Sequence, residues 1–216
     1  MYANDTSPNI LVFMDAKKYS SAAQRNRQPI LEVLKNSIPD SSNILEIASG
    51  TGEHAVFLAS RFPNCQWYPS DRDPQLRASI QAWKQEYFTA NLHPPLDIDA
   101  RDKKWQIEEI PVEIDVIVNI NMIHIAPFSA CEGLMAGAER ILSSKGILYL
   151  YGPYKKAGKH TAASNEAFDR SLRDRDSQWG VRNLEDVVAL AKTHHLQLQK
   201  VVEMPANNLS VIFQRI

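Results

Sequence analysis

The sequence has little cysteine, no surplus of charge of either sign and no long apolar run. Cys65 and Cys131 are the only two cysteines among 216 residues. They are too few for a disulfide framework, and neither lies in a Cys-x-x-Cys pair that could bind zinc. The 24 Lys and Arg residues face 25 Asp and Glu residues, which gives a formal net charge of -1. A chain so close to neutral lacks the field that attracts nucleic acid or anionic membranes, so we expect neither as the main partner.

The lack of a long apolar run bears on location and on the number of domains. No uncharged stretch approaches the roughly 18 apolar residues that span a bilayer, and the opening MYANDTSPNILVFMDAKK lacks the layout of a secretion signal. Both features predict a cytoplasmic protein. Hydrophobic residues make up 44% of the chain and charged residues 23%, with no low-complexity tract or internal repeat. We therefore expect residues 1–216 to fold as a single domain.

Apolar runs bounded by turn residues alternate with segments of helical period, which is typical of βα units around a mostly parallel sheet. Predicted strands cover 43–48, 66–69, 96–99, 114–120 and 146–151, and predicted helices cover 53–61, 74–87, 129–142, 165–176 and 184–194. The runs 198–203 and 209–214 flank a turn and predict a hairpin with one antiparallel strand. A further helix is predicted from about Pro29. We assign 1–36 to an N-terminal flap and this helix, and 43–216 to the core.

The residues that follow the first predicted strand favour binding of a nucleoside. Gly50 and Gly52 permit a tight turn and a close approach of backbone N–H groups to a ligand, and the next helix offers its positive end. In an open α/β sheet, ligands bind beyond the carboxyl ends of the strands, where the strand order reverses. Asp71 ends the second strand and can accept hydrogen bonds from both hydroxyls of a ribose. Asp99 ends the third and is placed to contact an adenine amine.

Two nucleotides fit this loop. Residues 50–55 match the dinucleotide fingerprint GxGxxG/A, and an acidic residue about 20 positions later is also the ribose ligand of that fingerprint. Three features favour S-adenosylmethionine over NAD: Glu46 inside the first strand, Glu53 at the start of the helix, and the closing hairpin. Carboxylates repel a pyrophosphate, whereas they attract the cationic sulfonium and amino groups of S-adenosylmethionine.

Several ordered motifs together resemble one family. They are 46–54 (EIASGTGEH), Asp71 with Pro74, 121–125 (NMIHI), 151–154 (YGPY), Ser164–Asn165 with Phe168–Asp169, and 179–182 (WGVR). From about Asp15 to the end, the chain resembles an uncharacterised class I S-adenosylmethionine-dependent methyltransferase family that includes methyltransferase-like protein 26.

The resemblance implies a fold and a cofactor, but no acceptor. The fold is the Rossmann-like class I methyltransferase fold, an α/β fold with a seven-stranded mostly parallel sheet, a C-terminal antiparallel hairpin and helices on both faces. The cofactor is S-adenosylmethionine, bound by the 46–54 loop, Asp71 and Asp99. Ala48 departs from the general class I pattern, where glycine is common, and makes the turn sterically more demanding. The predicted cofactor site comprises Glu46, Ala48, Ser49, Gly50, Gly52, His54, Asp71, Asp99, Ala100 and Asn119.

The candidate catalytic residues are Asn121, His124 and Tyr154. Methyl transfer needs alignment of the nucleophile and, for oxygen or nitrogen acceptors, a route for its proton. Residues just after the fourth strand usually line that spot, so we expect Asn121 or His124 to orient the acceptor, with His124 as the candidate base and Tyr154 as a second wall. The candidate substrate-binding residues are Arg25, Asn26, Tyr154 and His160. Together with Arg27, Lys155, Lys156 and Lys159, they predict a positive rim for an acidic small molecule.

The sequence thus predicts a methyltransferase that acts on a small-molecule acceptor. Two alternatives stay open: a non-catalytic S-adenosylmethionine-binding module that regulates a partner, and an NAD-dependent oxidoreductase. Turnover distinguishes the first, and the identity of the bound nucleotide distinguishes the second. A protein acceptor also stays open. His194 and His195 have no evident third ligand, so no metal is expected.

Overall fold

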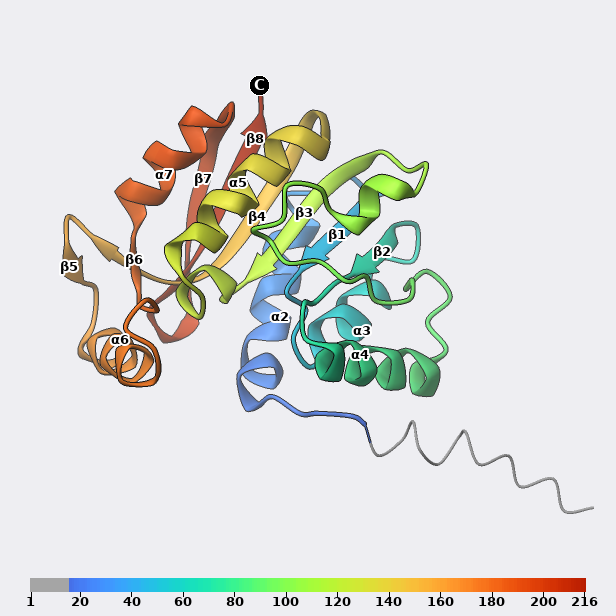
Figure 1. Ribbon diagram of the computed structural model, residues 1–216, viewed down its shortest axis with the longest axis horizontal. Coiled ribbons are helices and arrows are strands. Elements are labelled where there is room, and N and C mark those ends of the chain that lie inside the picture. Colours follow the sequence, from blue (N-terminus) through green and yellow to red (C-terminus); the bar gives the residue numbers. More distant parts are fainter. Residues whose placement is uncertain (1–15) are drawn as a thin grey trace, which may run out of the picture.

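A computed structural model describes residues 16–216 and shows one twisted sheet with helices on both faces (Figure 1). The strands follow the order β2-β1-β3-β4-β8-β7. Their bounds are β1 Asn43–Ile47, β2 Gln66–Pro69, β3 Ile114–Ile120, β4 Leu142–Lys156, β7 Leu196–Met204 and β8 Asn208–Arg215. Two short strands, β5 Lys159–His160 and β6 Arg182–Asn183, pair with the end of β4. Part of the predicted N-terminal flap, residues 1–15, lies outside the described residues.

The sheet is parallel except for one long strand and one short one. β1 pairs in parallel with both β2 and β3, and β3 pairs in parallel with β4. β8 runs antiparallel to β4 and to β7, so the predicted C-terminal hairpin is confirmed. The chain leaves β1 first for β2 and later returns to the other side of β1 as β3. The strand order therefore reverses at β1, which is where this class of sheet binds its ligands.

The third predicted strand, Leu96–Asp99, is wrong. This region makes only two isolated parallel bridges with the β2 region, Trp67 with Leu92 and Ser70 with Leu96. The two prolines that precede Leu96 in the sequence lack the N–H groups that a longer ladder needs. The sheet has eight strands, where seven were predicted, because this strand is missing and β5 and β6 are added.

Most helices form where the sequence predicts them. They are α2 Ser21–Lys35, α3 Glu53–Ala59, α4 Pro74–Tyr87, α5 Phe128–Ile141, α6 Ala163–Arg175 and α7 Leu184–Thr193, with the short 3-10 helices η1 Gln106–Glu109, η2 Met122–His124 and η3 Pro205–Asn207. Asp73 caps α4 as predicted, because its side chain accepts a hydrogen bond of 2.8 Å from the backbone N–H of Gln75.

Helix α2 begins earlier than predicted. It starts at Ser21, so Pro29 lies inside the helix, although proline removes one backbone hydrogen bond there. The Ser20 side chain caps the helix, and Ile30 and Leu34 bury its apolar face, which offset that loss. Residues 25–27, expected in a flap, therefore lie on a regular helix.

Two hydrophobic cores lie on the two faces of the sheet (Figure 1). One joins β3 and β4 to α5 and α7, with Leu134 and Val187 fully buried. The other joins the sheet to α2, α3 and α4, with Leu34, Leu58 and Trp83 buried. Cys65 and Cys131 are buried thiols, as expected. Across residues 16–216, no helix is both long enough and apolar enough to cross a bilayer.

Candidate functional site

A cavity of about 450 Å³ opens beyond the carboxyl ends of β1 and β3. Its walls are the glycine loop after β1, the end of β2, segment 98–101, the segment after β3, the first turn of α2 and Trp179. Of the predicted site residues, it brings together Glu46, Ala48, Ser49, Gly50, His54, Asp71, Asp99, Ala100 and Asn121. This volume is within the range of small-molecule sites, about 300–1,000 Å³.

The glycine loop turns through left-handed backbone conformations. Ala48 has a φ of 57°, which costs an alanine more than a glycine, and Gly50 has a φ of 58°. Ser49 fixes the loop to β2, because its N–H donates to Ser70 O at 2.7 Å and its Oγ accepts from Ser70 N–H at 3.1 Å. A Cβ at Gly50 would meet no atom within 4 Å. The loop therefore leaves open space at Gly50 for a ligand.

Gly52 has a different role from the one predicted. It does not line the cavity, and its φ is 91°. A Cβ there would lie 2.8 Å from Ile80 Cα. Gly52 therefore lets α3 pack closely on α4, and the prediction that it contacts the cofactor is not supported.

Asp71 ties the end of β2 to the glycine loop. Its Oδ2 accepts from Gly50 N–H at 3.0 Å, and its Oδ1 accepts from Asp73 N–H at 2.9 Å. Burial raises the pKa of Asp71, and these two hydrogen bonds oppose that rise. Each oxygen keeps a lone pair, since a carboxylate oxygen can accept two hydrogen bonds. Asp71 can therefore accept from two neighbouring hydroxyls of a ligand in the cavity.

Glu46 is a buried acid on the cavity wall, 1% exposed. Its Oε2 accepts from the indole N–H of Trp67 at 2.8 Å. Burial raises the pKa of Glu46 to about 7, although the hydrogen bond from Trp67 opposes the rise. A cation placed beside this carboxyl would favour its ionised form.

Asp99 reaches the cavity together with two arginines that the sequence reasoning missed. Arg101 Nε donates to Asp99 Oδ1 at 2.9 Å, and Arg72 Nη1 lies 3.3 Å from Oδ2. The hydrogen bonds from Arg101 hold the pKa of Asp99 well below its usual range. The sequence did contain a signal for this pair, because Arg101 follows Asp99 by only two residues. An adenine amine at Asp99 would share the carboxylate with these guanidinium groups.

His54 lies on α3 and is backed by Asn26 of α2. Its Nε2 is 2.8 Å from Asn26 Oδ1, and since an amide oxygen only accepts, the proton sits on Nε2. Burial and the nearby charge of Arg27 lower the pKa of His54 to about 4. The ring is therefore neutral at neutral pH. Asn26 itself does not line the cavity.

Asn121 ends β3 with a left-handed backbone, φ 66°, a conformation that asparagine adopts more readily than most residues. Its N–H donates to Tyr151 O at 2.8 Å, which holds it at the cavity wall. Asn119, two residues earlier, is buried behind the wall. Its Nδ2 donates to Ile47 O at 2.9 Å, so Asn119 supports β1 rather than facing the cavity.

The prediction that His124 and Tyr154 line the acceptor pocket is wrong. Both side chains are fully buried beneath the wall, with ring centroids 5.0 Å apart. His124 Nδ1 accepts from the backbone N–H of Arg182 at 3.3 Å. Burial, with the charge of Arg182, lowers the pKa of His124 to about 3. The structure therefore places His124 in the core and not on the cavity wall.

The predicted positive rim does not form at the cavity either. Arg25 is exposed on α2, and His160 lies 3.3 Å from Asp169. Lys155 pairs with the same carboxylate at 3.1 Å. His160 and Lys155 therefore lie beside Asp169, in the middle of α6, and do not line the cavity.

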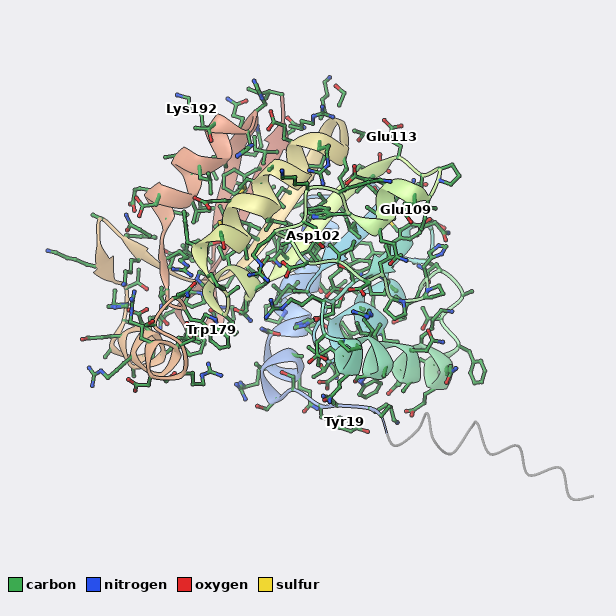
Figure 2. The ribbon with its side chains drawn as sticks, viewed as in Figure 1. Tyr19, Asp102, Glu109, Glu113, Trp179 and Lys192 are labelled. Atoms are coloured by element: carbon green, nitrogen blue, oxygen red, sulfur yellow. The ribbon has the colours of Figure 1, made fainter. Side chains whose placement is uncertain are left out.

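Sequence reasoning also missed most of the apolar wall, formed by Ala22, Ala23, Ile125, Ala126 and Pro127, with Met122 beside them. Trp179 lines the cavity from the loop between α6 and β6 (Figure 2). These residues come from segments far apart in the chain, and no local pattern connects them.

An open sheet with this strand order, a closing antiparallel strand and a cavity beyond the glycine loop defines the class I methyltransferase fold. Three solved structures share it: an O-methyltransferase family protein from Burkholderia thailandensis, a putative O-methyltransferase from Nostoc punctiforme PCC 73102, and human N-acetylserotonin methyltransferase in complex with SAM. Their TM-scores are 0.75, 0.77 and 0.72, and their sequence identities to this chain are 13%, 15% and 15%.

The matches cover 98%, 97% and 95% of this chain, but only 60%, 62% and 55% of the three proteins. The chain therefore spans about three fifths of the length of these structures. At such identities the likeness shows the fold alone. By its own sequence, the chain belongs to the family described as Protein of unknown function (DUF938), whose model matches residues 17–215.

Proposed function

We propose that the chain binds S-adenosylmethionine in this cavity and transfers its methyl group to a small-molecule acceptor. The observation that carries the proposal is the pairing of Asp71 with Gly50. One carboxylate holds the glycine loop in place and keeps lone pairs for the hydroxyls of a ribose. The ordered motifs that resemble the family of methyltransferase-like protein 26, and the shared fold of the solved methyltransferases, support the same function.

The residues on the wall fit the parts of this cofactor. Asp71 would accept from the ribose hydroxyls, and the loop at Gly50 has room for the ligand to approach the backbone. Glu46, whose ionisation a cation favours, would face the positive end of the molecule. Asp99 and Ala100 would lie beside the adenine.

The charges of the wall argue against a dinucleotide. Glu46 lies on the cavity wall beside the glycine loop, where a pyrophosphate would have to lie. The arginines among the lining residues, Arg72 and Arg101, both pair with Asp99. A cationic cofactor therefore suits the loop better than an anionic one.

When bound, S-adenosylmethionine supplies a sulfonium methyl group that an acceptor atom attacks in line, breaking the carbon–sulfur bond and leaving its electron pair on sulfur. The protein's part is then mainly alignment and the exclusion of water. Asn121 is the polar residue after β3 that stays on the cavity wall, so we assign it the orienting role that the sequence shared between Asn121 and His124. The neutral His54 is a second polar group on this wall.

Calorimetric titration of the purified chain with S-adenosylhomocysteine and with NAD tests the cofactor. Gly50→Ala keeps the fold, because its Cβ meets nothing within 4 Å, but puts a methyl group into the ligand's space. We expect it to weaken S-adenosylhomocysteine binding at least tenfold. The matched control is Gly158→Ala, also at positive φ (75°) with no atom within 4 Å, on the exposed turn after β4, and it should bind normally.

Binding of NAD and not of S-adenosylhomocysteine would overturn the proposal in favour of an oxidoreductase. Turnover is tested separately, by mass-spectrometric detection of S-adenosylhomocysteine formed from S-adenosylmethionine with a panel of small hydroxyl, amine and thiol compounds. Binding without turnover across the panel would favour the non-catalytic module.

A further inference from the structure

The end of the cavity that would hold the acceptor has an aromatic wall, and hydrogen bonds hold the loop that carries it. Trp179 lies in the loop between α6 and β6, and in Figure 2 it projects between α6 and α2. The backbone N–H of Trp179 donates to Asp176 O at 3.0 Å, and the backbone N–H of Gly180 donates to His124 O at 2.9 Å. The next N–H, of Val181, donates to Asp169 Oδ1 at 2.7 Å. Three successive backbone N–H groups thus hold the main chain of the loop that carries Trp179.

Arg182 joins this loop to segment 123–126, which also lines the cavity. Its Nε donates to Ile123 O at 2.8 Å and its Nη2 donates to Ala126 O at 2.6 Å. The same Nη2 donates to Gln178 O at 2.9 Å, in the residue before Trp179. One guanidinium group therefore holds the loop that carries Trp179 against segment 123–126.

The surfaces around the indole are apolar. Ile125 lines the cavity and is 37% exposed. Ala22 and Ala23 of α2 and Pro127 complete this end. The outer side of the indole is occupied by Arg175, whose guanidinium lies 5.3 Å from the ring centroid. Aromatic rings pack favourably on an indole, at about 0.5–1.5 kcal/mol beyond the area they bury.

Two cations, Arg72 and Arg101, line the described cavity, and both pair with Asp99. Lys155, His160 and Arg173 converge on Asp169 and do not line the cavity. No lysine lines the described cavity either. A charged acceptor would therefore lose its hydration and meet only lining cations that already have a partner.

We infer that the methyl acceptor is a small, uncharged, planar aromatic molecule that stacks on Trp179. This inference rests on the proposed function and adds the class of acceptor to it. Trp179 then determines specificity by its shape and aromatic face, while the cofactor is held by other residues of the same cavity.

The indole N–H signals of ¹⁵N-labelled protein provide a site-specific measurement. The chain has 4 tryptophans, of which Trp67, Trp83 and Trp105 are buried and Trp179 is half-buried. Trp179→Phe identifies the Trp179 signal by its loss. The probe is 1-naphthol, and decahydro-1-naphthol is its saturated counterpart. Both are titrated into protein saturated with S-adenosylhomocysteine, and 1-naphthoate serves as the anionic probe.

We expect 1-naphthol to shift the Trp179 signal saturably and to bind at least tenfold more tightly than its saturated counterpart or 1-naphthoate. Trp179→Ala should weaken 1-naphthol at least tenfold with unchanged affinity for S-adenosylhomocysteine, and Trp179→Phe should retain most of the affinity. Equal binding of the flat and saturated probes, tighter binding of 1-naphthoate, or unchanged binding by Trp179→Ala would each overturn the inference. If the wild type does not bind S-adenosylhomocysteine, that result would instead contradict the proposed function.

Discussion

The carboxylate of Glu53, the first residue of α3, accepts a hydrogen bond from the backbone N–H of Ser20, the residue that caps α2. The other oxygen, Oε1, accepts from Gln24 Nε2 at 3.2 Å, and Oε2 also accepts from the hydroxyl of Thr51 at 3.2 Å. One side chain therefore joins the glycine loop to the start of α2. Because Ser20 and Ala23 line the cavity, Glu53 sets the position of this wall without facing the ligand.

Replacing Glu53 by alanine should affect both stability and ligand binding. The change removes the hydrogen-bond acceptor of the half-buried Ser20 N–H and of the exposed Gln24 amide. A poorly solvated N–H without a partner costs about 1–3 kcal/mol, whereas an exposed amide can bond to water instead. We expect the free energy of unfolding in urea to fall by about 2 kcal/mol, and S-adenosylhomocysteine to bind several-fold more weakly. Glu32→Ala, on the exposed face of α2, is the control and should change neither quantity appreciably. If Glu53→Ala has the stability and the affinity of the wild type, the hydrogen bonds of Glu53 are not needed for either property.

Glu46 should make stability depend on pH near neutrality. Its pKa is about 7 in the folded protein, against an ordinary value of 4.5, because burial favours the protonated form. The stability that the protonated carboxyl provides is complete below about pH 4.5 and is lost as the pH rises through 7. The loss amounts to about 3 kcal/mol.

Comparison with Glu46→Gln isolates this contribution. The difference in free energy of unfolding between wild type and variant, measured from pH 4.5 to pH 8, should decline by that amount. A difference that is constant over this range would contradict a raised pKa of Glu46. Binding of S-adenosylhomocysteine, whose amino group is cationic, should strengthen between pH 6 and pH 8 in the wild type and not in the variant.

His54 should have the opposite effect on the acid side. Burial lowers its pKa to about 4, against an ordinary value of 6.5, so the folded protein favours the neutral ring. The corresponding stability is present above pH 6.5 and is lost as the pH falls through 4. His124, with a pKa of about 3, should add to the same acid sensitivity. His54→Gln should lose stability less steeply than the wild type between pH 6.5 and pH 4. An identical slope would exclude His54 as a source.

Replacing each of the two glycines of the loop by alanine should have different effects: Gly52→Ala should lower stability, and Gly50→Ala should lower ligand affinity. A Cβ at Gly52 meets Ile80 Cα at 2.8 Å, so α3 and α4 must move apart, and we expect a cost of at least about 2 kcal/mol in the free energy of unfolding. Gly50→Ala adds only the strain of a left-handed alanine, about 1 kcal/mol, but should lose ligand affinity. Thermal denaturation and calorimetry on both variants check this. A more stable Gly52→Ala than Gly50→Ala would refute the packing role.

Much of the fold follows from local pattern. The apolar run 114–120 is β3, and Asp73 with Pro74 starts α4 as expected, because capping and period act over a few residues. The third strand failed where prolines removed backbone donors. Helix α2 continued through Pro29 because burial of Ile30 and Leu34 outweighed the local penalty.

The polar wall of the cavity was predictable in part for the same reason. Glu46, Gly50 and Asp71 lie at or just beyond strand ends whose convergence follows from the order of βα units, and the cavity brings them together. The apolar part of the wall was not predictable, because it comes from α2, the segment after β3 and the loop at Trp179.

By itself, the sequence determined the class of fold, the position of the glycine loop, the acid in β1 and the acid that follows β2, since all of these depend on short-range periodicity and turn chemistry. Only the tertiary structure decided which polar groups face the cavity. His124 and His160 became partners of Arg182 and Asp169, whereas His54 and Trp179 reached the cavity wall. The physical reason is that a side chain's surroundings are set by packing between segments distant in sequence, and those contacts determine both its exposure and its charge.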